Sequence, residues 1–426
     1  MLLGVAAIMS VGIIDAYFIG QLSAEALAAV SFIFPVTVAL SSLGVGLMAG
    51  TSSVVSRALG SGDRARAHDR ANLSIALAAI CGLAFAGLIL ALRMPLFELM
   101  QADVELLPLI DAYMLPFALG FPLFFLMFGI NGGLRGQGAA KKSSSILIAY
   151  AAVNWVLDPI LITGAFGFEG FGIAGAAYAT IGGWLVAAAL GFFMFQSEGL
   201  PFSFACLKRL HWADGTKAIM KVAGPAAFSN SVNPMGLAVL TALIAQQGQD
   251  AVAGFGAGGR LQSFAVVPLL ALSGSIGAIV GQNWGAERFD RVRRAVLLAG
   301  GFCIAYGLVT AALLVWARES LAGLFSDDAA VQGQIMRYLS IAAWGYATYG
   351  ILIVSNGAMN AVGYAGIALG QSVFRMAALM VPAAFLLRPG WGADGVYAAE
   401  LLANLGGGLT GAALLWWLFW HRRKAA

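Results

Sequence analysis

Two polar side chains interrupt an apolar stretch of the sequence in a way that suggests ion binding. Asn154 and Asp158 lie four residues apart within the run Ile146–Ile162, so a helix would place both on one face. A carboxylate at membrane depth is costly and is usually kept for a function. Pro159 follows directly and leaves a backbone carbonyl one turn earlier without its donor. This polar face beside a weakened turn predicts a site that binds and releases a small cation. A structural aspartate satisfied by local hydrogen bonds is the alternative.

Two further polar residues are expected at a similar depth. Asp15 precedes the turn that starts near Gly20, and Asp158 precedes Gly164 by a similar distance. At 1.5 Å per residue, both carboxylates lie about 8–9 Å below their helix ends. The span that starts near Gly172 enters the bilayer from the same side, and Thr180, eight residues later, lies about 12 Å deep. We therefore expect Asp15, Asn154, Asp158 and Thr180 to meet on the first, fifth and sixth spans.

Two kinds of ion fit this set of side chains. Hard cations such as Na⁺ take several oxygen ligands. A pair of buried carboxylates can instead hold a proton, because burial and mutual repulsion favour the neutral form. The sequence leaves H⁺ and Na⁺ both open as the coupling ion. It predicts no cofactor, and no metal site beyond Na⁺ at this position.

Composition places these residues in a membrane protein. The chain has 426 residues, of which 60% are hydrophobic and 10% charged, against about 25% charged in soluble domains. Apolar runs near 20 residues recur and predict an all-α integral membrane protein with twelve transmembrane helices. The strands of a membrane β-barrel would instead show alternating apolar and polar residues. The apolar N-terminus lacks a basic leader region and is interpreted as the first span rather than a signal peptide. The predicted spans are residues 1–20, 26–56, 71–93, 106–131, 143–164, 171–196, 217–245, 252–281, 292–316, 334–356, 365–387 and 393–420.

Charge placement sets the expected orientation. Most of the 24 lysines and arginines fall in one set of loops and in the tail. Positively charged loops stay in the cytoplasm, so both termini are expected there, in a bacterial inner membrane. The net charge of +4 is then explained by topology, and nucleic-acid binding is not expected. The predicted partners are the lipid bilayer and a small organic substrate, with the chain acting as a monomer.

The two halves of the sequence repeat. Asn131-Gly132 recurs as Asn356-Gly357 at an offset of 225, and Gly172-Ile173-Ala174-Gly175 recurs as Gly392-Ala393-Asp394-Gly395 at 220. Two six-helix lobes of parallel topology are typical of transporters with a substrate site between the repeats. The expected domains are an N-terminal lobe 1–196, a cytoplasmic linker 197–216, a C-terminal lobe 217–420 and a basic tail 421–426. The alignment also predicts a first span one or two turns short, as in a chain truncated at its start.

The second half does not repeat the cation site. The positions equivalent to Asn154 and Asp158 are apolar, and Glu400 is the counterpart of Thr180. A buried Glu400 needs a partner, and a structural ion pair with Arg260 or Arg375 is expected. A role of Glu400 in ion coupling is the alternative. The cation site is therefore assigned to the first lobe alone.

Several motifs resemble those of the multidrug and toxic compound extrusion (MATE) family. They are Asp15 five residues before Gly20, then Leu27-Ala28-Ala29-Val30, the loop Gly281-Gln282-Asn283-Trp284-Gly285-Ala286, Asn154-x-x-x-Asp158-Pro159 and Gly175-Ala176-Ala177-x-Ala179-Thr180. The resemblance implies a V-shaped two-lobe antiporter that exports drugs or metabolites against Na⁺ or H⁺. It carries the family's first-lobe cation site onto Asp15, Asn154, Asp158 and Thr180. One branch has a glutamate in the seventh span where Asn233 aligns here, so the chain resembles the branch named for a DNA-damage-inducible protein.

The substrate is expected to bind in a cavity between the two lobes. Aromatic, methionine and amide side chains of the inter-lobe cavity would contact substrate, and the candidates are Tyr17, Phe34, Phe228, Asn230, Asn233, Met235 and Phe255. We expect alternating-access exchange of an organic, often cationic, substrate for H⁺ or Na⁺.

A lipid or lipid-linked oligosaccharide flippase of the same superfamily is the alternative, although it would have a more basic cavity. An enzyme is not expected, because His68, His211 and His421 lie in loops or the tail and Cys81, Cys206 and Cys303 form no metal or redox motif. A passive channel is disfavoured by the two-lobe repeat.

Overall fold

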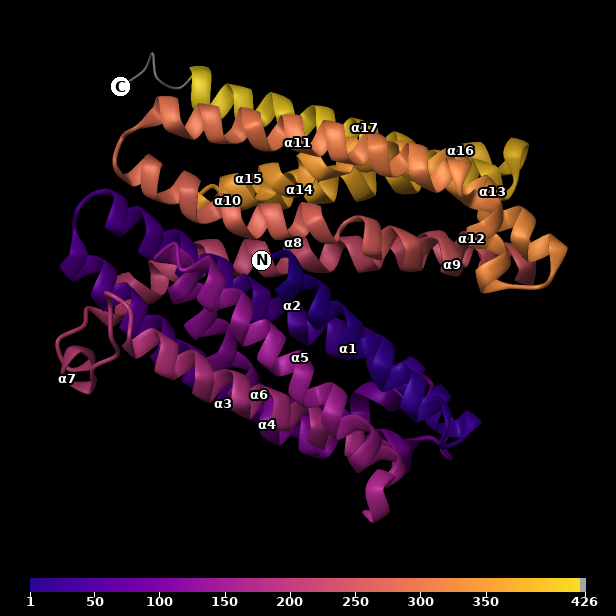
Figure 1. Cartoon of the computed structure of the whole chain (residues 1–426), viewed down its shortest axis with the longest axis horizontal. Helices are drawn as coiled ribbons and strands as arrows, with labels where there is room; N and C mark the ends of the chain where they lie inside the picture. The colour runs from indigo at the N-terminus through magenta and orange to yellow at the C-terminus, as the bar shows by residue number, and fades with distance from the viewer. Residues whose placement is uncertain (422–426) are drawn as a thin grey trace. The chain divides into compact units, whose positions relative to one another are not determined.

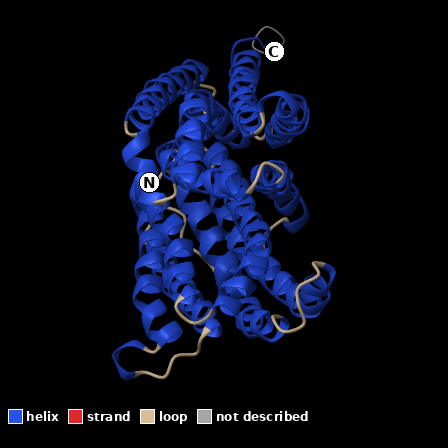
Figure 2. Ribbon diagram, turned by 90° about the vertical axis from the view of Figure 1, so that its right-hand side faces the viewer, coloured by secondary structure: helices blue, strands red, loops and turns tan. Residues whose placement is uncertain are grey.

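Helices and their connecting loops make up the whole of the chain that the computed structural model describes, residues 1–421 (Figure 2). Residues 422–426, most of the predicted basic tail, lie outside this range. Twelve helical stretches in the described range are long and apolar enough to cross a membrane. The predicted fold class, an all-helical protein with twelve spans, is confirmed.

The chain divides into two compact units, Met1–Ala227 and Phe228–Ala426. The boundary falls inside one long helix, so it differs from the expected lobe limits around the linker 197–216. The helices of the first unit are α1 (Leu2–Gly20), α2 (Ala24–Gly60), α3 (Arg64–Leu99), α4 (Leu107–Gly136), α5 (Ala140–Thr163), α6 (Ile173–Gln196), the short α7 (Phe204–Leu207) and the first part of α8 (Trp212–Ala245). They are labelled in Figure 1.

The second unit begins within α8 and continues through the C-terminal half. Its helices are α9 (Gln249–Ala265), α10 (Val267–Gly285), α11 (Phe289–Trp316), α12 (Arg318–Phe325), α13 (Ala329–Ala342), α14 (Tyr346–Ala361), α15 (Ala365–Val373), α16 (Val381–Trp391) and α17 (Ala393–Trp416). A π-helical segment, η3 (Phe374–Met380), joins α15 to α16, and another, η4 (Trp417–His421), follows α17. Short 3-10 turns lie at η1 (Ala165–Gly167) and η2 (Ala343–Gly345).

Left-handed turns mark the repeat between the two halves. Gly62 and Glu287 have φ of 81° and 56°, and Gly138 and Gly363 have φ of 82° and 87°, each pair at the offset of 225. Gly172 and Gly392 have φ of 60° and 59° at the offset of 220. Equivalent turns between helices in the two halves therefore share left-handed backbone geometry.

The change of offset has a local cause. The helical stretch Ala365–Trp391 has 27 residues, whereas its counterpart α5 has 24. The connection that follows is Gly392 alone in the second half, but residues 164–172 in the first. A helix three residues longer and a connection eight residues shorter together reduce the offset by five.

The α5–α6 hairpin positions the predicted polar residues of the first unit. Helix α5 ends at Thr163 and is followed by Gly164, whose φ of 78° is left-handed, as is common one residue past a helix. The connection folds back on α5, and the Phe171 amide donates a 2.7 Å hydrogen bond to the Leu161 carbonyl. Gly175 lets α6 approach, because a Cβ there would lie 2.0 Å from the Leu161 oxygen. This close approach places Thr180 opposite the polar face of α5.

Candidate cation site in the first unit

The four predicted site residues come together among α1, α5 and α6. Asn154 and Asp158 are fully buried and Thr180 is 4% exposed, while Asp15 is partly buried on α1. The Asn154 Nδ2 donates a 3.4 Å hydrogen bond to the Thr180 hydroxyl. The side chain of Asp15 interacts with those of both Asp158 and Asn154. The structure therefore brings together the four side chains that were expected at a similar depth.

Four oxygens of this cluster have no hydrogen-bond partner among the described residues. They are Asp15 Oδ1, Asn154 Oδ1, and both Asp158 Oδ1 and Oδ2. Buried polar atoms are nearly always satisfied, so each exception calls for an explanation such as an ion or a proton. The structural alternative of an aspartate satisfied by local hydrogen bonds does not fit Asp158, because both of its carboxyl oxygens are unsatisfied.

Two tyrosines that the sequence analysis did not identify face the same carboxyl groups. Tyr113 on α4 and Tyr150 on α5 are buried, and both interact electrostatically with Asp15 and Asp158. Tyr150 precedes Asn154 by four residues, so the helical spacing that groups Asn154 with Asp158 could also have found it. Tyr113 comes from a helix whose contact with the site only the tertiary structure shows.

This arrangement can hold one positive charge. The charges of Asp15 and Asp158 act on each other, so the two carboxyl groups repel when both are ionised. Either a bound cation or a shared proton relieves this repulsion. The unsatisfied oxygens are the hard ligands that Na⁺ prefers. The residues present thus fit both coupling ions that the sequence left open.

The second unit contains a different polar cluster around Glu400, and the expected ion pair is wrong. Glu400 is 1% exposed. It accepts hydrogen bonds from Gln262 Nε2 at 2.8 Å and from the Tyr338 hydroxyl at 3.2 Å. In the described part of the chain, neither Arg260 nor Arg375 forms an ion pair with the Glu400 carboxylate. The charge of Arg375 still acts on this carboxylate from a distance.

Other contacts hold Arg375, and the position of Arg260 on its helix turns it away from Glu400. Arg375 donates hydrogen bonds to Asn404 Oδ1 at 2.6 and 3.1 Å and to Asn233 Oδ1 at 3.0 Å, and its guanidinium covers the Tyr349 ring at 4.7 Å. Arg260 lies two residues before Gln262, almost on the opposite side of α9.

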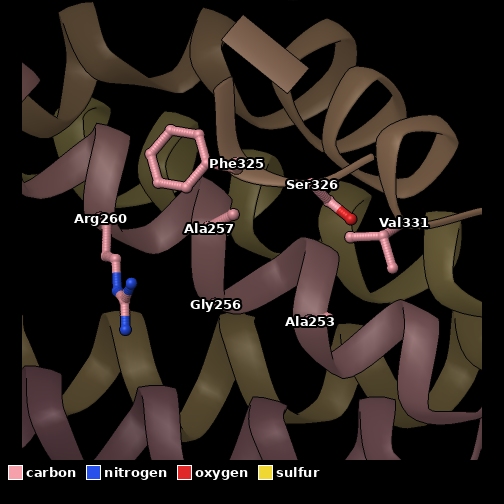
Figure 3. Close-up of a pocket in the computed structure, with 7 residues that line it drawn as sticks. All are labelled: Ala253, Gly256, Ala257, Arg260, Phe325, Ser326 and Val331. Carbon is pink, nitrogen blue, oxygen red and sulfur yellow. The ribbon is translucent and has the colours of Figure 1, made fainter. Parts of the chain in front are cut away.

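Arg260 instead lines a small cavity on the second unit. The cavity has a volume of about 310 Å³, and its other walls include Phe325, Ser326 and Val331 (Figure 3). The arginine is exposed rather than buried with Glu400. The expected pairing failed because Gln262 and Tyr338 are the partners of Glu400, and Asn404 is a partner of Arg375.

The candidate substrate contacts divide into exposed and packed side chains. Tyr17, Phe34, Phe228 and Met235 are between 60% and 70% exposed, and Asn230 is exposed on α8. The expectation that Phe255 contacts substrate is wrong. Phe255 is 5% exposed and packs in the core of the second unit against the rings of Tyr338 and Tyr397. Asn233 serves as the acceptor for Arg375 described above.

Comparison with known proteins identifies the family. A sequence model of the MatE family matches residues 1–160 and 225–386. The chain is 35% identical over 412 residues to a protein of Shewanella oneidensis named FAD transporter, covering 95% of this chain and 89% of that protein. It is 26% identical over 414 residues to the multidrug export protein MepA of Staphylococcus aureus, covering 95% and 88%.

Solved structures agree with this assignment. The crystal structure of a mutant of the Vibrio cholerae MATE transporter VcmN matches with a TM-score of 0.92 at 28% identity, covering 99% of this chain and 94% of that one. The match to the family extends over both halves of the sequence, and the resemblance to the MATE family inferred from the motifs is confirmed, whereas the branch within the family stays a prediction. The chain therefore belongs to the MATE family of membrane transporters.

Proposed function

We propose that the protein is an efflux antiporter in which H⁺ or Na⁺ binding at Asp15, Asn154, Asp158 and Thr180 drives export of an organic substrate. The single observation that supports this proposal is the group of four unsatisfied oxygens buried around Asp158. Leaving these oxygens without partners is costly, and a bound positive ion would offset that cost. The protein lies in the inner membrane with both termini in the cytoplasm, as its charge distribution indicates.

Ion binding would act on the position of α1. Asp15 is the residue of the cluster that lies on α1, while Asn154 and Asp158 belong to α5, against which α1 packs. Without the ion, repulsion between the carboxylates favours their separation, and with it they share one positive charge. The ion therefore binds more tightly to the conformation in which α1 stays close to α5. A ligand shifts a conformational equilibrium only through such a difference in affinity.

The substrate class has two candidates. The similarity to a multidrug export protein supports a broad range of organic compounds, often cationic. The similarity at 35% identity to a protein named FAD transporter supports flavin dinucleotide as a second, more specific candidate. The relatives reported above are named as transporters or export proteins, which does not favour the flippase alternative.

Efflux from proteoliposomes tests the proposal. The purified protein is reconstituted with a fluorescent organic cation or with FAD, and pH and Na⁺ gradients are imposed separately. We expect one gradient to drive substrate movement against its concentration, and the responding gradient identifies the coupling ion. Substrate movement that is equally fast without any gradient would contradict antiport and support a passive channel.

A further inference from the structure

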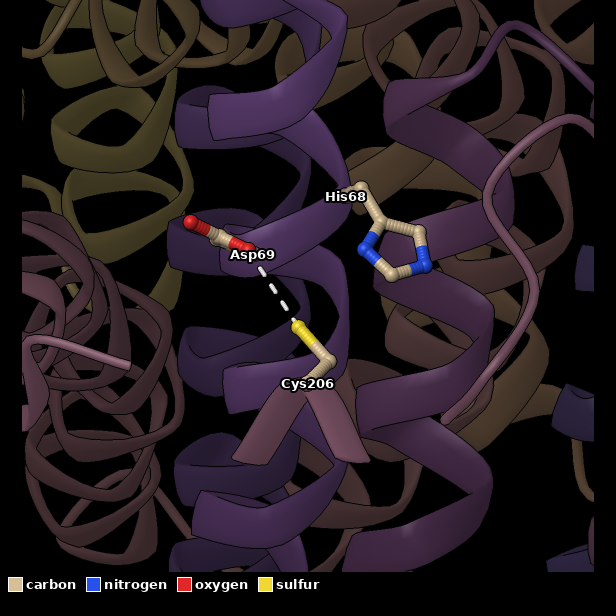
Figure 4. Close-up of side chains that lie close together, drawn as sticks. All are labelled: His68, Asp69 and Cys206. Atoms are coloured by element: carbon tan, nitrogen blue, oxygen red, sulfur yellow. Dashed lines mark hydrogen bonds between the residues drawn. The ribbon is translucent and has the colours of Figure 1, made fainter. Parts of the chain in front are cut away.

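Three side chains with metal-binding atoms meet where the segment after α6 crosses α3. His68 and Asp69 lie in the second turn of α3, and Cys206 lies on α7 (Figure 4). One potential ligand atom from each residue lies within 4.8 Å of the other two. The Cys206 thiol donates a 3.2 Å hydrogen bond to Asp69 Oδ1, across 137 residues of sequence.

We infer that His68, Asp69 and Cys206 form a binding site for a divalent transition metal of the Zn²⁺ class. Imidazole nitrogen, thiolate sulfur and carboxylate oxygen are the three protein ligand types of zinc. Zinc binds them at about 2.0–2.3 Å in a tetrahedral arrangement, so ligand atoms of one site lie roughly 3–4 Å apart. The ligand atoms of the cluster lie within 4.8 Å of one another, so metal binding would bring these side chains slightly closer together. Three protein ligands leave one position for water.

The backbone around Cys206 is held in place by a separate set of contacts. The buried Asn72 of α3 donates from Nδ2 to the carbonyls of His68 at 3.0 Å and Pro201 at 3.2 Å. Its Oδ1 accepts a 2.7 Å hydrogen bond from the Ser203 amide. One side chain therefore joins the turn of α3 that carries His68 to the segment that carries Cys206. The site is preorganised, which reduces the entropy that a metal would have to offset.

The charges nearby favour a metal that binds thiolate strongly. Arg209 acts electrostatically on Cys206, and Arg70 lies close to Asp69. These guanidinium groups disfavour hard cations held by charge alone, such as Ca²⁺ or Mg²⁺. A cysteine binds metal as the thiolate, so metal binding would release the proton that the Cys206 thiol now shares with Asp69.

Metal binding would fasten the connection between α6 and α8 to α3. The connecting segment 197–211 contains α7 and is expected on the same side as the basic loops. A metal bound by His68, Asp69 and Cys206 adds a link between this segment and α3 beyond the hydrogen bonds of Asn72. This site is separate from the cluster around Asp158, so it does not depend on the proposed coupling ion.

Cobalt absorption tests the site directly. Co²⁺ replaces Zn²⁺ at such sites, and a bound thiolate gives a charge-transfer band in the near ultraviolet. We expect the tag-free purified protein to show this band and to lose it when Zn²⁺ is added. Cys206→Ser should abolish the band, and His68→Gln or Asp69→Asn should each weaken Zn²⁺ binding by at least about 10-fold, the effect of even an indirect metal contact.

Matched variants separate this site from adventitious binding. Cys81→Ser removes a thiol of α3 that is outside the cluster, and His211→Gln removes an imidazole five residues after Cys206 in the sequence. Both variants should leave the band unchanged. Zn²⁺ should also slow hydrogen exchange of the amides in segment 201–207, and Cys206→Ser should remove this protection. A wild-type protein without the band at saturating Co²⁺, or a band that persists in Cys206→Ser, would overturn the inference. Unchanged exchange with Zn²⁺ bound would overturn the fastening of the segment.

Discussion

The carboxyl groups of Asp15 on α1 and Asp158 on α5 lie close enough to act on each other, although the two residues belong to different helices far apart in the sequence. Oδ1 of Asp15 and both carboxyl oxygens of Asp158 have no hydrogen-bond partner in the described part of the chain. The pair is therefore destabilising unless a positive ion or a proton joins it. Its position between two helices makes it sensitive to their separation.

Replacing Asp158 should uncouple transport without unfolding the protein. Asp158→Asn removes one of two repelling charges while keeping the shape of the side chain. We expect gradient-driven efflux to fall at least about tenfold, within the usual range of coupling energies, and the unfolding temperature to stay the same or rise. Efflux from proteoliposomes and thermal unfolding in detergent measure the two effects. Unchanged gradient-driven efflux would contradict a coupling role for this residue.

The Thr180 hydroxyl should contribute to both stability and ion affinity. Thr180→Val keeps the shape but leaves Asn154 Nδ2 without its acceptor, which should cost about 1 kcal/mol of unfolding free energy. Loss of one oxygen should also weaken ion binding, measured as a higher ion concentration for half-maximal efflux. Thr180→Ser retains the hydroxyl and serves as the control. Equal ion dependence in the valine and serine variants would exclude Thr180 from the site.

Gly175 should be required for the α5–α6 contact. An alanine Cβ at this position would lie 2.0 Å from the Leu161 carbonyl oxygen, and such overpacking typically costs about 1–3 kcal/mol. This exceeds the gain of up to about 1 kcal/mol from replacing glycine by alanine in a helix. Gly182→Ala on the same helix meets only the flexible end of Leu157 and should be tolerated. Thermal unfolding of both variants is the measurement, and equal stabilities would refute the close-packing argument.

Glu287 should be a strained position that glycine relieves. Its φ of 56° is left-handed, and the equivalent turn of the first half has Gly62. The left-handed conformation costs a non-glycine residue about 1–2 kcal/mol, partly offset by the greater entropy that glycine loses on folding. Glu287→Gly should therefore raise the unfolding temperature slightly, and Gly62→Ala should lower it. A lower unfolding temperature for Glu287→Gly would show that its side chain contributes more than the strain costs.

Glu400 should have a structural rather than a coupling role. Glu400→Gln keeps a side chain of the same size that can hydrogen-bond Gln262 and Tyr338. We expect this variant to retain gradient-driven efflux, in contrast to Asp158→Asn. Glu400→Leu should destabilise the second unit by about 1–3 kcal/mol, because Gln262 and Tyr338 lose their acceptor. Loss of coupling in a folded Glu400→Gln would instead assign an ion site to the second unit.

The sequence by itself determined the fold class and grouped the four residues of the candidate cation site. Apolar length fixes the number of spans, because a helix must bury about 20 residues to cross a bilayer. The helical rise then gives the depth of each polar residue, which was enough to group Asp15, Asn154, Asp158 and Thr180. Depth is a property of one helix and its ends, so it can be calculated without knowing which helices touch.

Only the tertiary structure decided which side chains meet at a given depth. Helix rotation and packing place Tyr113 beside the carboxyl groups, give Glu400 neutral partners and bury Phe255 in the core. They also bring Cys206 to His68 and Asp69, a grouping that spacing along the chain does not suggest. These contacts depend on how ridges of one helix fill the grooves of another, and small residues such as Gly175 control that packing through contacts with distant segments.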